Sequence, residues 1–211
     1  MSAAWQDRSY DLDSLDKLRE LYPSPEAPAT LDKECDHIHP LYRPFIDAAP
    51  FAVLATRSPR GLDCSPRGDA PGFVTVADEK TLLLPDRRGN NRIDSLRNVL
   101  HDPEVALLFL IPGIGEALRV NGTARISAAP ALLQRFEFEG KLPRSVLVID
   151  VKLVFFQCAR AIKRSGLWEP AAQIARSVLP STGSILQALS ARVDGAAYDA
   201  ALEERQRLTM Y

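Results

Sequence analysis

The apolar residues change period at Phe51, and this change constrains the fold more than any other feature of the chain. Before Phe51 they recur at helical spacing, whereas after it they mostly alternate with polar residues. Alternation with a period of two is typical of half-buried β-strands. The turn Ser58-Pro59-Arg60-Gly61 has proline second and glycine fourth, as a type I turn prefers. We predict strands over Phe51–Thr56, Leu62–Pro66, Phe73–Ala77, Thr81–Leu84, Val105–Ile111, Ala117–Ile126 and Val146–Phe156.

Helical patterns are few among these strands. One helix is expected over Arg92–Leu100 and a short one over Ala131–Glu139. A parallel α/β sheet would need a helix after nearly every strand. The pattern therefore predicts a mainly β fold, a small antiparallel barrel with accessory helices.

Three parts of the chain differ in pattern. Residues 1–50 are expected to form a helical N-terminal extension packed on the barrel, with short helices near Leu12–Tyr22 and Ile38–Ala48. Residues 51–170 are expected to form the barrel, and residues 171–211 a set of C-terminal helices. Ser14 or Asp13 can cap the first helix.

Composition narrows the function classes. Lysine plus arginine number 26 and aspartate plus glutamate 27, so the net charge is −1, whereas nucleic-acid-binding proteins usually carry a basic excess. The longest apolar stretch is far shorter than the ~20 residues that a membrane helix needs. The three cysteines are widely spaced, and no signal-peptide pattern opens the chain. We expect a cytoplasmic protein that binds neither nucleic acid nor membranes.

The segment from Leu84 to Val99 carries the clearest chemistry. A strand ends, a loop rich in Arg, Gly and Asn follows, and a helix begins, with Asn91 as a candidate N-cap and Asp94 three residues later. Free amides at a helix start attract anions. Together with Arg87, Arg88 and Arg92 they suit a phosphate, although the same residues also suit an ordinary solvated turn.

Two further segments carry polar residues that suit a ligand. The strand ending at Ser65 and Arg67 offers a hydroxyl and a guanidinium, which complete a phosphate site if they lie beside the helix start. The strand around Arg119 and Asn121 alternates strictly, so its polar face meets solvent, a ligand or another subunit. Trp168, in a connecting loop, suits either a core position or an aromatic cofactor.

Other chemistries find less support. Cys35, His37 and His39 offer metal-ligand types, but no fourth ligand is evident for zinc. Gly113 and Gly115 lack the third glycine of a dinucleotide-binding turn. No nucleophile elbow is present, and three histidines leave few bases for a hydrolytic triad.

These segments resemble a known family, the FMN-binding split barrels related to pyridoxamine 5′-phosphate oxidase, and within it the bacterial branch assigned to FMN-dependent enzymes. The likeness spans roughly residues 35–190. It rests on 51–56, 63–73, 84–92, 97–98, 109–113 and 118–122. It implies an antiparallel split β-barrel, a homodimer, and an FMN site at the subunit interface. The C-terminal substrate-recognition pattern of the vitamin oxidase itself is missing, so another substrate is expected.

The resemblance also assigns residues by position. It implies that Ser65, Arg67 and Arg92 bind the FMN phosphate, and that Leu84 and Pro85 lie along the flavin ring. Arg88 and Asn91 would lie near the ribityl chain or phosphate, Arg119 and Asn121 would come from the partner subunit, and Trp168 would lie near the isoalloxazine. No catalytic residue is assigned.

Three functions follow as hypotheses. The first is an FMN-dependent oxidoreductase acting on an unknown small molecule, with a nicotinamide as one candidate electron donor and Arg119 as a donor that stabilises charge on the reduced flavin. The second is a non-catalytic flavin-binding or carrier protein. The third is a split barrel that uses haem or a deazaflavin. Haem would need an axial ligand, and the few histidines of the chain offer little support for it.

Overall fold

A computed structural model of the chain describes residues 6–22 and 30–211. Contacts divide it into two units, Met1–Glu34 and Cys35–Tyr211. The first unit holds a 3-10 helix, Arg8–Tyr10, and helix α1 (Leu15–Leu21). The Ser14 side chain accepts from the amide of Lys17, which confirms it as the N-cap of α1. Residues 1–5 and 23–29 of the expected N-terminal extension lie outside the described residues, and its packing on the barrel stays a prediction.

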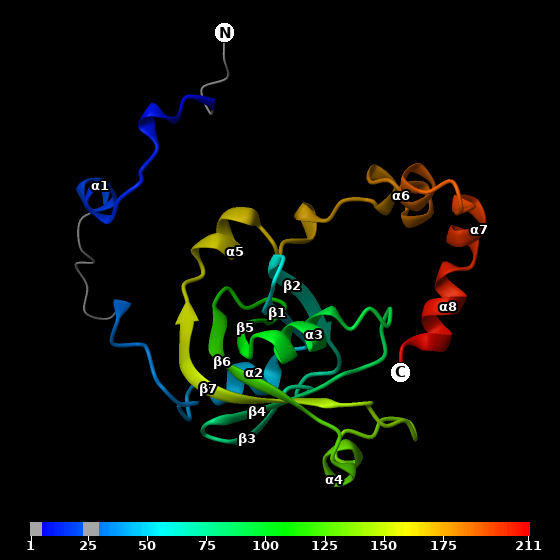
Figure 1. Ribbon diagram of the computed structural model, residues 1–211, viewed down its shortest axis with the longest axis horizontal. Coiled ribbons are helices and arrows are strands. Elements are labelled where there is room, and N and C mark those ends of the chain that lie inside the picture. Colours follow the sequence, from blue (N-terminus) through cyan, green and yellow to red (C-terminus); the bar gives the residue numbers. More distant parts are fainter. Residues whose placement is uncertain (1–5, 23–29) are drawn as a thin grey trace. The chain divides into compact units, whose positions relative to one another are not determined.

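The second unit is built on one antiparallel sheet of seven strands in the order β2-β1-β5-β6-β7-β4-β3, among the residues described (Figure 1). The predicted mainly β antiparallel fold is therefore confirmed. All seven predicted strands form, with ends that shift by at most two residues. Their bounds are β1 (Phe51–Ser58), β2 (Gly61–Gly68), β3 (Thr75–Asp78), β4 (Thr81–Pro85), β5 (Glu104–Leu110), β6 (Ala117–Ser127) and β7 (Val146–Gln157).

The sheet is open, with β2 and β3 as its edges and no ladder joining them in the described part of the chain. Its two longest strands, β6 and β7, pair from Ala117–Gln157 to Ser127–Val146, and the register shifts between Asn121 and Gly122. A Cβ at Gly122 would collide with the backbone oxygen of Asp150 on β7. Glycine is therefore required where the two strands come closest. An open, strongly paired antiparallel sheet of this kind is a split barrel.

Burial along the strands follows the predicted alternation. In β1, Ala52, Leu54 and Thr56 are buried, and in β6 the even-numbered positions from Leu118 to Ala124 are buried. Strand β4 differs, because Leu82 to Pro85 are buried without a break. Two separate apolar clusters cover the two faces of β4, so a continuous apolar run is required there.

Helices occupy the gaps between strands and the C-terminal part. Helix α3 packs against β1 and β6, and α2 packs against β3. Among the described residues no helix combines the length and hydrophobicity needed to cross a membrane. The bounds are α2 (Arg43–Ala48), α3 (Asp94–His101), α4 (Pro130–Gln134), α5 (Arg160–Ser165), α6 (Thr182–Leu189), α7 (Gly195–Ala200) and α8 (Leu202–Thr209), with short 3-10 turns at Pro170–Ala172 and Arg176–Val178.

Two predicted helices are too long. Helix α2 begins at Arg43 rather than Ile38, because Pro44 suits only a first helical turn. Helix α4 ends at Gln134 rather than Glu139. The chain there turns into a β-bridge, with Glu139 and Gly140 in the left-handed region.

Candidate functional site

One cavity of about 1120 Å³ opens beside strands β2 and β4, the loop that follows β4, and the segment before β7. This volume exceeds the roughly 300–1,000 Å³ of typical small-molecule sites. Seven of the ten predicted site residues line it together, although they come from three separate elements of the chain: Ser65, Arg67, Leu84, Pro85, Arg88, Asn91 and Arg92.

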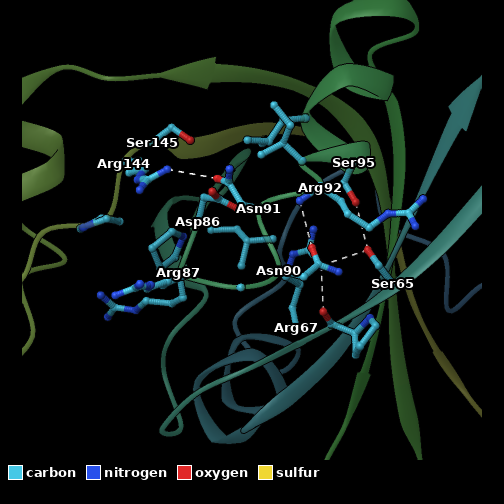
Figure 2. A pocket seen from close by; sticks show the side chains of 18 of the residues that line it. Ser65, Arg67, Asp86, Arg87, Asn90, Asn91, Arg92, Ser95, Arg144 and Ser145 are labelled. Atoms are coloured by element: carbon cyan, nitrogen blue, oxygen red, sulfur yellow. Dashed lines mark hydrogen bonds between the residues drawn. The ribbon is translucent and has the colours of Figure 1, made fainter. Parts of the chain in front are cut away.

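Three polar side chains converge on one side of the cavity (Figure 2). Arg67 donates from Nη1 to Ser65 Oγ at 2.9 Å and to the backbone oxygen of Pro66 at 2.8 Å. The hydroxyls of Ser65 and Ser95 are 3.0 Å apart, which joins the edge strand to the first turn of α3. We name Ser65, Arg67, Ser95 and the first turn of α3 the anion cradle. The condition on which the sequence made a phosphate site depend, that this strand end lies beside the helix start, is thus met.

Electrostatics in the cavity favour an anionic ligand. Burial lowers the pKa of Arg67, against the opposing effect of the carboxylates of Asp86 and Asp63. A buried guanidinium that lacks water is stabilised by a negative partner. Six cationic and three acidic side chains line the cavity, so its charge also attracts anions.

The helix start differs from the predicted one. Helix α3 begins at Asp94, after Ile93 in the left-handed region with no side-chain cap. The prediction that Asn91 is the N-cap is therefore wrong. Asn91 itself has φ 59°, a conformation asparagine tolerates, and its Oδ1 accepts from Arg144 Nη1 at 3.1 Å. Asp94 binds Arg92 Nε at 2.7 Å instead of completing a capping box.

Arg87 has a structural role in place of the predicted phosphate contact. Its Nε donates to Asp69 Oδ2 and its Nη1 to the backbone oxygen of Phe136, both at 2.8 Å. Its guanidinium also lies over the rings of Phe138 and Tyr211. The hydroxyl of Tyr211 donates to Asp69 at 2.9 Å. We name Asp69, Arg87, Phe138 and Tyr211 the latch, because they fix the loop after β4 to distant parts of the chain.

Sequence reasoning missed several lining residues on the other side of the cavity. Asp86, Arg144, Ser145 and Tyr211 all line it. Burial raises the pKa of Asp86, against the opposing effect of Arg67 and Arg144. Asp86 lies inside the predicted segment Leu84–Val99 but was given no role, and nothing in the sequence near Arg144, Ser145 or Tyr211 signals a site. Their placement depends on strand pairing and on contacts far along the chain.

Three predicted site residues do not line this cavity. Arg119 is exposed on β6, with its guanidinium over the ring of Phe155. Asn121 has a buried Oδ1 with no hydrogen-bond partner among the residues described. Trp168 donates from Nε1 to the backbone oxygen of Ile114 at 2.7 Å and borders a separate small pocket. Their roles toward a ligand stay predictions.

Metal ligands do not cluster in the described ranges. No group of three or more His, Cys, Asp or Glu side chains there is placed to hold an ion. His37 is engaged by its neighbour Asp36 through Nδ1 at 2.9 Å, and that carboxylate also binds Lys80. The Lys80 ammonium, with a smaller contribution from His37, lowers the pKa of Asp36 to about 2.

The open seven-stranded antiparallel sheet defines a split-barrel protein, and its cavity is lined by more cationic than acidic side chains. A comparison with protein-family models agrees with this class. The model described as pyridoxamine 5′-phosphate oxidase matches residues 38–158, which is more than half of the chain. The chain therefore belongs to the pyridoxamine 5′-phosphate oxidase family. Among curated protein sequences no relative matches it.

Three solved structures of similar fold each cover a little over half of the chain. A variant of HupZ from Group A Streptococcus shares 18% identity with a TM-score of 0.48, over 57% of this chain and 99% of that one. A provisionally named pyridoxamine 5′-phosphate oxidase from Lactobacillus delbrueckii shares 19% with a TM-score of 0.45, over 57% and 95%. General Stress Protein 26 from Bacillus anthracis shares 17% with a TM-score of 0.40, over 54% and 88%.

Proposed function

We propose that this protein binds FMN in the cavity and is an FMN-dependent oxidoreductase for a small-molecule substrate. The observation that carries the proposal is the anion cradle, where a half-buried arginine and two linked serines meet the start of α3. Helix starts and arginines together form phosphate sites in many folds. The residues present therefore fit the phosphate of FMN.

The other predicted residues fit the rest of the cofactor. Leu84 and Pro85 are buried residues that line the cavity, and they offer apolar surface to a flat ring. Arg88 and Asn91 line the cavity beyond them, within the loop that follows β4. When bound, FMN supplies reversible hydride and electron transfer at its ring. The chain contributes the phosphate contacts, the apolar wall and the charge of its arginines.

A homodimer is part of this proposal. Arg119 and Asn121 lie on β6 and do not line this chain's own cavity, and the Arg119 side chain is exposed. A second copy would bring these residues and Trp168 to the cavity. Size-exclusion chromatography with light scattering should give a dimer, whereas a monomer with full flavin occupancy contradicts this arrangement.

The lining residues favour FMN over haem. Among the described residues of the cavity wall, none is a histidine, cysteine or methionine, which are common axial ligands of haem iron. Tyr211, which also lines the cavity, already donates its hydroxyl to Asp69. The third hypothesis, with haem in this cavity, thus lacks a suitable ligand.

The first test is the absorption spectrum of the purified protein, followed by heat release and mass of the ligand. FMN at near one per chain supports the proposal. A colourless protein that does not bind added FMN overturns it. Riboflavin is the matched control, because it lacks the phosphate and should bind far more weakly. Turnover with a nicotinamide donor then separates an enzyme from a carrier, which would bind FMN without turnover.

A further inference from the structure

The C-terminal helices α6, α7 and α8 form a group with few ties to the barrel. They follow one another in a row, orange to red in Figure 1. Helix α6 packs against α7 and α7 against α8, whereas none of the three packs closely against a strand within the described residues. Their buried residues are Gly183 and Gly195, which face each other across the α6–α7 contact. We name residues 181–211 the strap.

The first two helices of the strap hold each other in place. On α7, the Asp199 carboxylate accepts from the amide of Gly183 on α6 at 2.7 Å. On α6, Gln187 Oε1 accepts from the amide of Gly195 on α7 at 2.9 Å. A Cβ at Gly183 would collide with the backbone oxygen of Gly195, so the two helices are in direct backbone contact. The α6–α7 corner therefore keeps its shape without support from the barrel.

The strap reaches the cavity through Tyr211, the residue of the latch that it contributes. Tyr211 lines the cavity, and its hydroxyl donates to Asp69 at 2.9 Å. Its ring lies 4.4 Å from the ring of Phe138, centroid to centroid, and 5.7 Å from the guanidinium carbon of Arg87. One side chain thus makes all the latch contacts of the strap.

The residues just before Tyr211 add little to this attachment. Helix α8 has no buried residue, and the side chains of Leu208 and Met210 are both more than half exposed. A segment with few buried contacts opens locally at a lower free energy than the whole domain unfolds. Tyr211 can therefore leave the latch while the barrel stays folded.

Release of Tyr211 changes the cavity in two ways. It removes one lining residue, and it takes an aromatic ring and a shared acceptor away from the neighbourhood of Arg87. Arg87 belongs to the loop that also carries Arg88, Asn91 and Arg92, the predicted ligand contacts outside the strands. The strap therefore controls both the wall of the cavity and the mobility of this loop.

We propose that the strap is a lid, which closes the cavity when Tyr211 joins the latch and whose opening sets the rate at which a ligand, here FMN, enters and leaves. This inference rests on the proposed function, because it takes FMN as the ligand. The anion cradle lies outside the strap, so affinity and exchange rate depend on different residues. A lid that closes equally well over the empty and the filled cavity changes both rates by the same factor and leaves the Kd unchanged.

The test measures the two rates separately. Stopped-flow mixing of FMN with the flavin-free protein gives the association rate, and recovery of flavin fluorescence on dilution of the loaded protein gives the release rate. Tyr211→Ala should raise both rates at least about tenfold, because the stacked ring and the hydrogen bond are lost, and the Kd should stay within about threefold. Tyr211→Phe keeps the ring and should raise both rates only about threefold.

A matched tyrosine provides the control. Tyr10 is 85% exposed in the first unit of the chain, so Tyr10→Ala should leave both rates within about twofold of the parent. Two outcomes overturn the inference. One is that Tyr211→Ala changes neither rate. The other is a rise in the release rate alone, with a tenfold higher Kd, which would make Tyr211 a direct contact of the ligand instead of part of a lid.

Hydrogen exchange in the flavin-free protein distinguishes failure of this inference from failure of the proposed function. Tyr211→Ala should speed amide exchange in residues 86–93 at least about tenfold and leave exchange in β6 unchanged. If FMN does not bind but exchange in the loop responds in this way, the proposed cofactor is wrong and the lid stands. If exchange in residues 86–93 is unaffected, the lid is overturned whether or not FMN binds.

Discussion

The cavity has two walls that are held in different ways. We name the parts of β2 and β4 that line it the sheet wall, and residues 86–93 with 141–145 the loop wall. On the sheet wall each residue has a ladder partner, as Ser65 has in Leu54 and Leu84 has in Leu147. On the loop wall the backbone is held in place mainly by side-chain hydrogen bonds, such as those of Arg87 with Asp69 and of Arg144 with Asn91.

This difference matters for binding. Successive side chains of a strand point to opposite faces of the sheet, so backbone pairing fixes the direction of each one. The sheet wall is therefore in place before a ligand binds. The loop wall keeps its shape only while the latch holds. We therefore expect the sheet wall to determine cofactor affinity and the loop wall to respond to ligand, pH and substitution.

The largest expected effect is on the sheet wall. Arg67→Ala should raise the Kd of FMN at least about 30-fold, because the half-buried guanidinium proposed to bind the FMN phosphate is lost. Fluorescence quenching of the flavin on titration measures it. Arg60→Ala, in the turn between β1 and β2 and outside the cavity lining, is the control and should stay within threefold. A similar small change in Arg67→Ala would contradict the assignment of the anion cradle.

The latch should dominate the stability of the loop wall. Asp69 is nearly fully buried, with its side chain 4% exposed, and it accepts from both Arg87 and Tyr211. Asp69→Asn should lower the free energy of unfolding by about 1.5–3 kcal/mol, since it weakens two hydrogen bonds and leaves Arg87 without its counter-charge. Tyr211→Phe removes one hydroxyl only and should cost about 0.5–1.5 kcal/mol.

Urea denaturation measures both latch variants, and limited proteolysis reports on residues 86–93. Faster cleavage in this loop is expected for Asp69→Asn, with less change in Tyr211→Phe. Equal and negligible effects of the two substitutions would show that the loop is held without the latch, and the contrast between the two walls would then be lost.

Two glycines contrast the sheet with the loop directly. Gly122→Ala would push a Cβ into the backbone of Asp150, and paired strands cannot yield easily, so we expect a loss of about 1–3 kcal/mol. Gly89, in the loop wall, would meet nothing within 4 Å on gaining a Cβ. Gly89→Ala should stay within roughly 0.5 kcal/mol. Thermal unfolding measures the Tm of each variant. Equal changes in Tm for Gly122→Ala and Gly89→Ala would contradict the closer packing around Gly122.

The same contrast explains which features the sequence could predict. The strands, the β1–β2 hairpin and the outward face of β6 follow from alternation and turn chemistry, which are local. The approach of Ser65 to α3 could not be predicted outright from the sequence, since it depends on how α3 packs against the sheet. Asn91 misled the prediction because its side chain binds Arg144, 53 residues away, instead of capping the helix. Tyr211 meets Asp69 across 142 residues, and no local pattern records such a contact.

The smallest expected effect concerns Asp86, a carboxyl group in the wall of the cavity. Because burial raises the pKa of Asp86, the folded protein holds this proton more tightly than the unfolded chain does. The free energy of unfolding therefore falls as pH rises from about 4 through the raised pKa of Asp86, because the carboxyl group ionises. It stays at the lower value at pH above that pKa. Asp86→Asn is neutral throughout, so its Tm relative to the parent should rise between pH 4 and pH 7. A flat difference would contradict the burial of this charge.

Asp199 offers a control of opposite sign. The hydrogen bond from Ser181 and that from the Gly183 amide lower the pKa of Asp199. Its ionised form stabilises the fold above pH 4, and that stability is lost as pH falls through the lowered pKa. Relative to the parent, Asp199→Asn should therefore lose stability as pH rises from the lowered pKa to about 4 and then stay level, whereas Asp86→Asn gains stability above pH 4. Scanning calorimetry of the two variants at several pH values measures both trends, and parallel trends would show a general charge effect instead of two local environments.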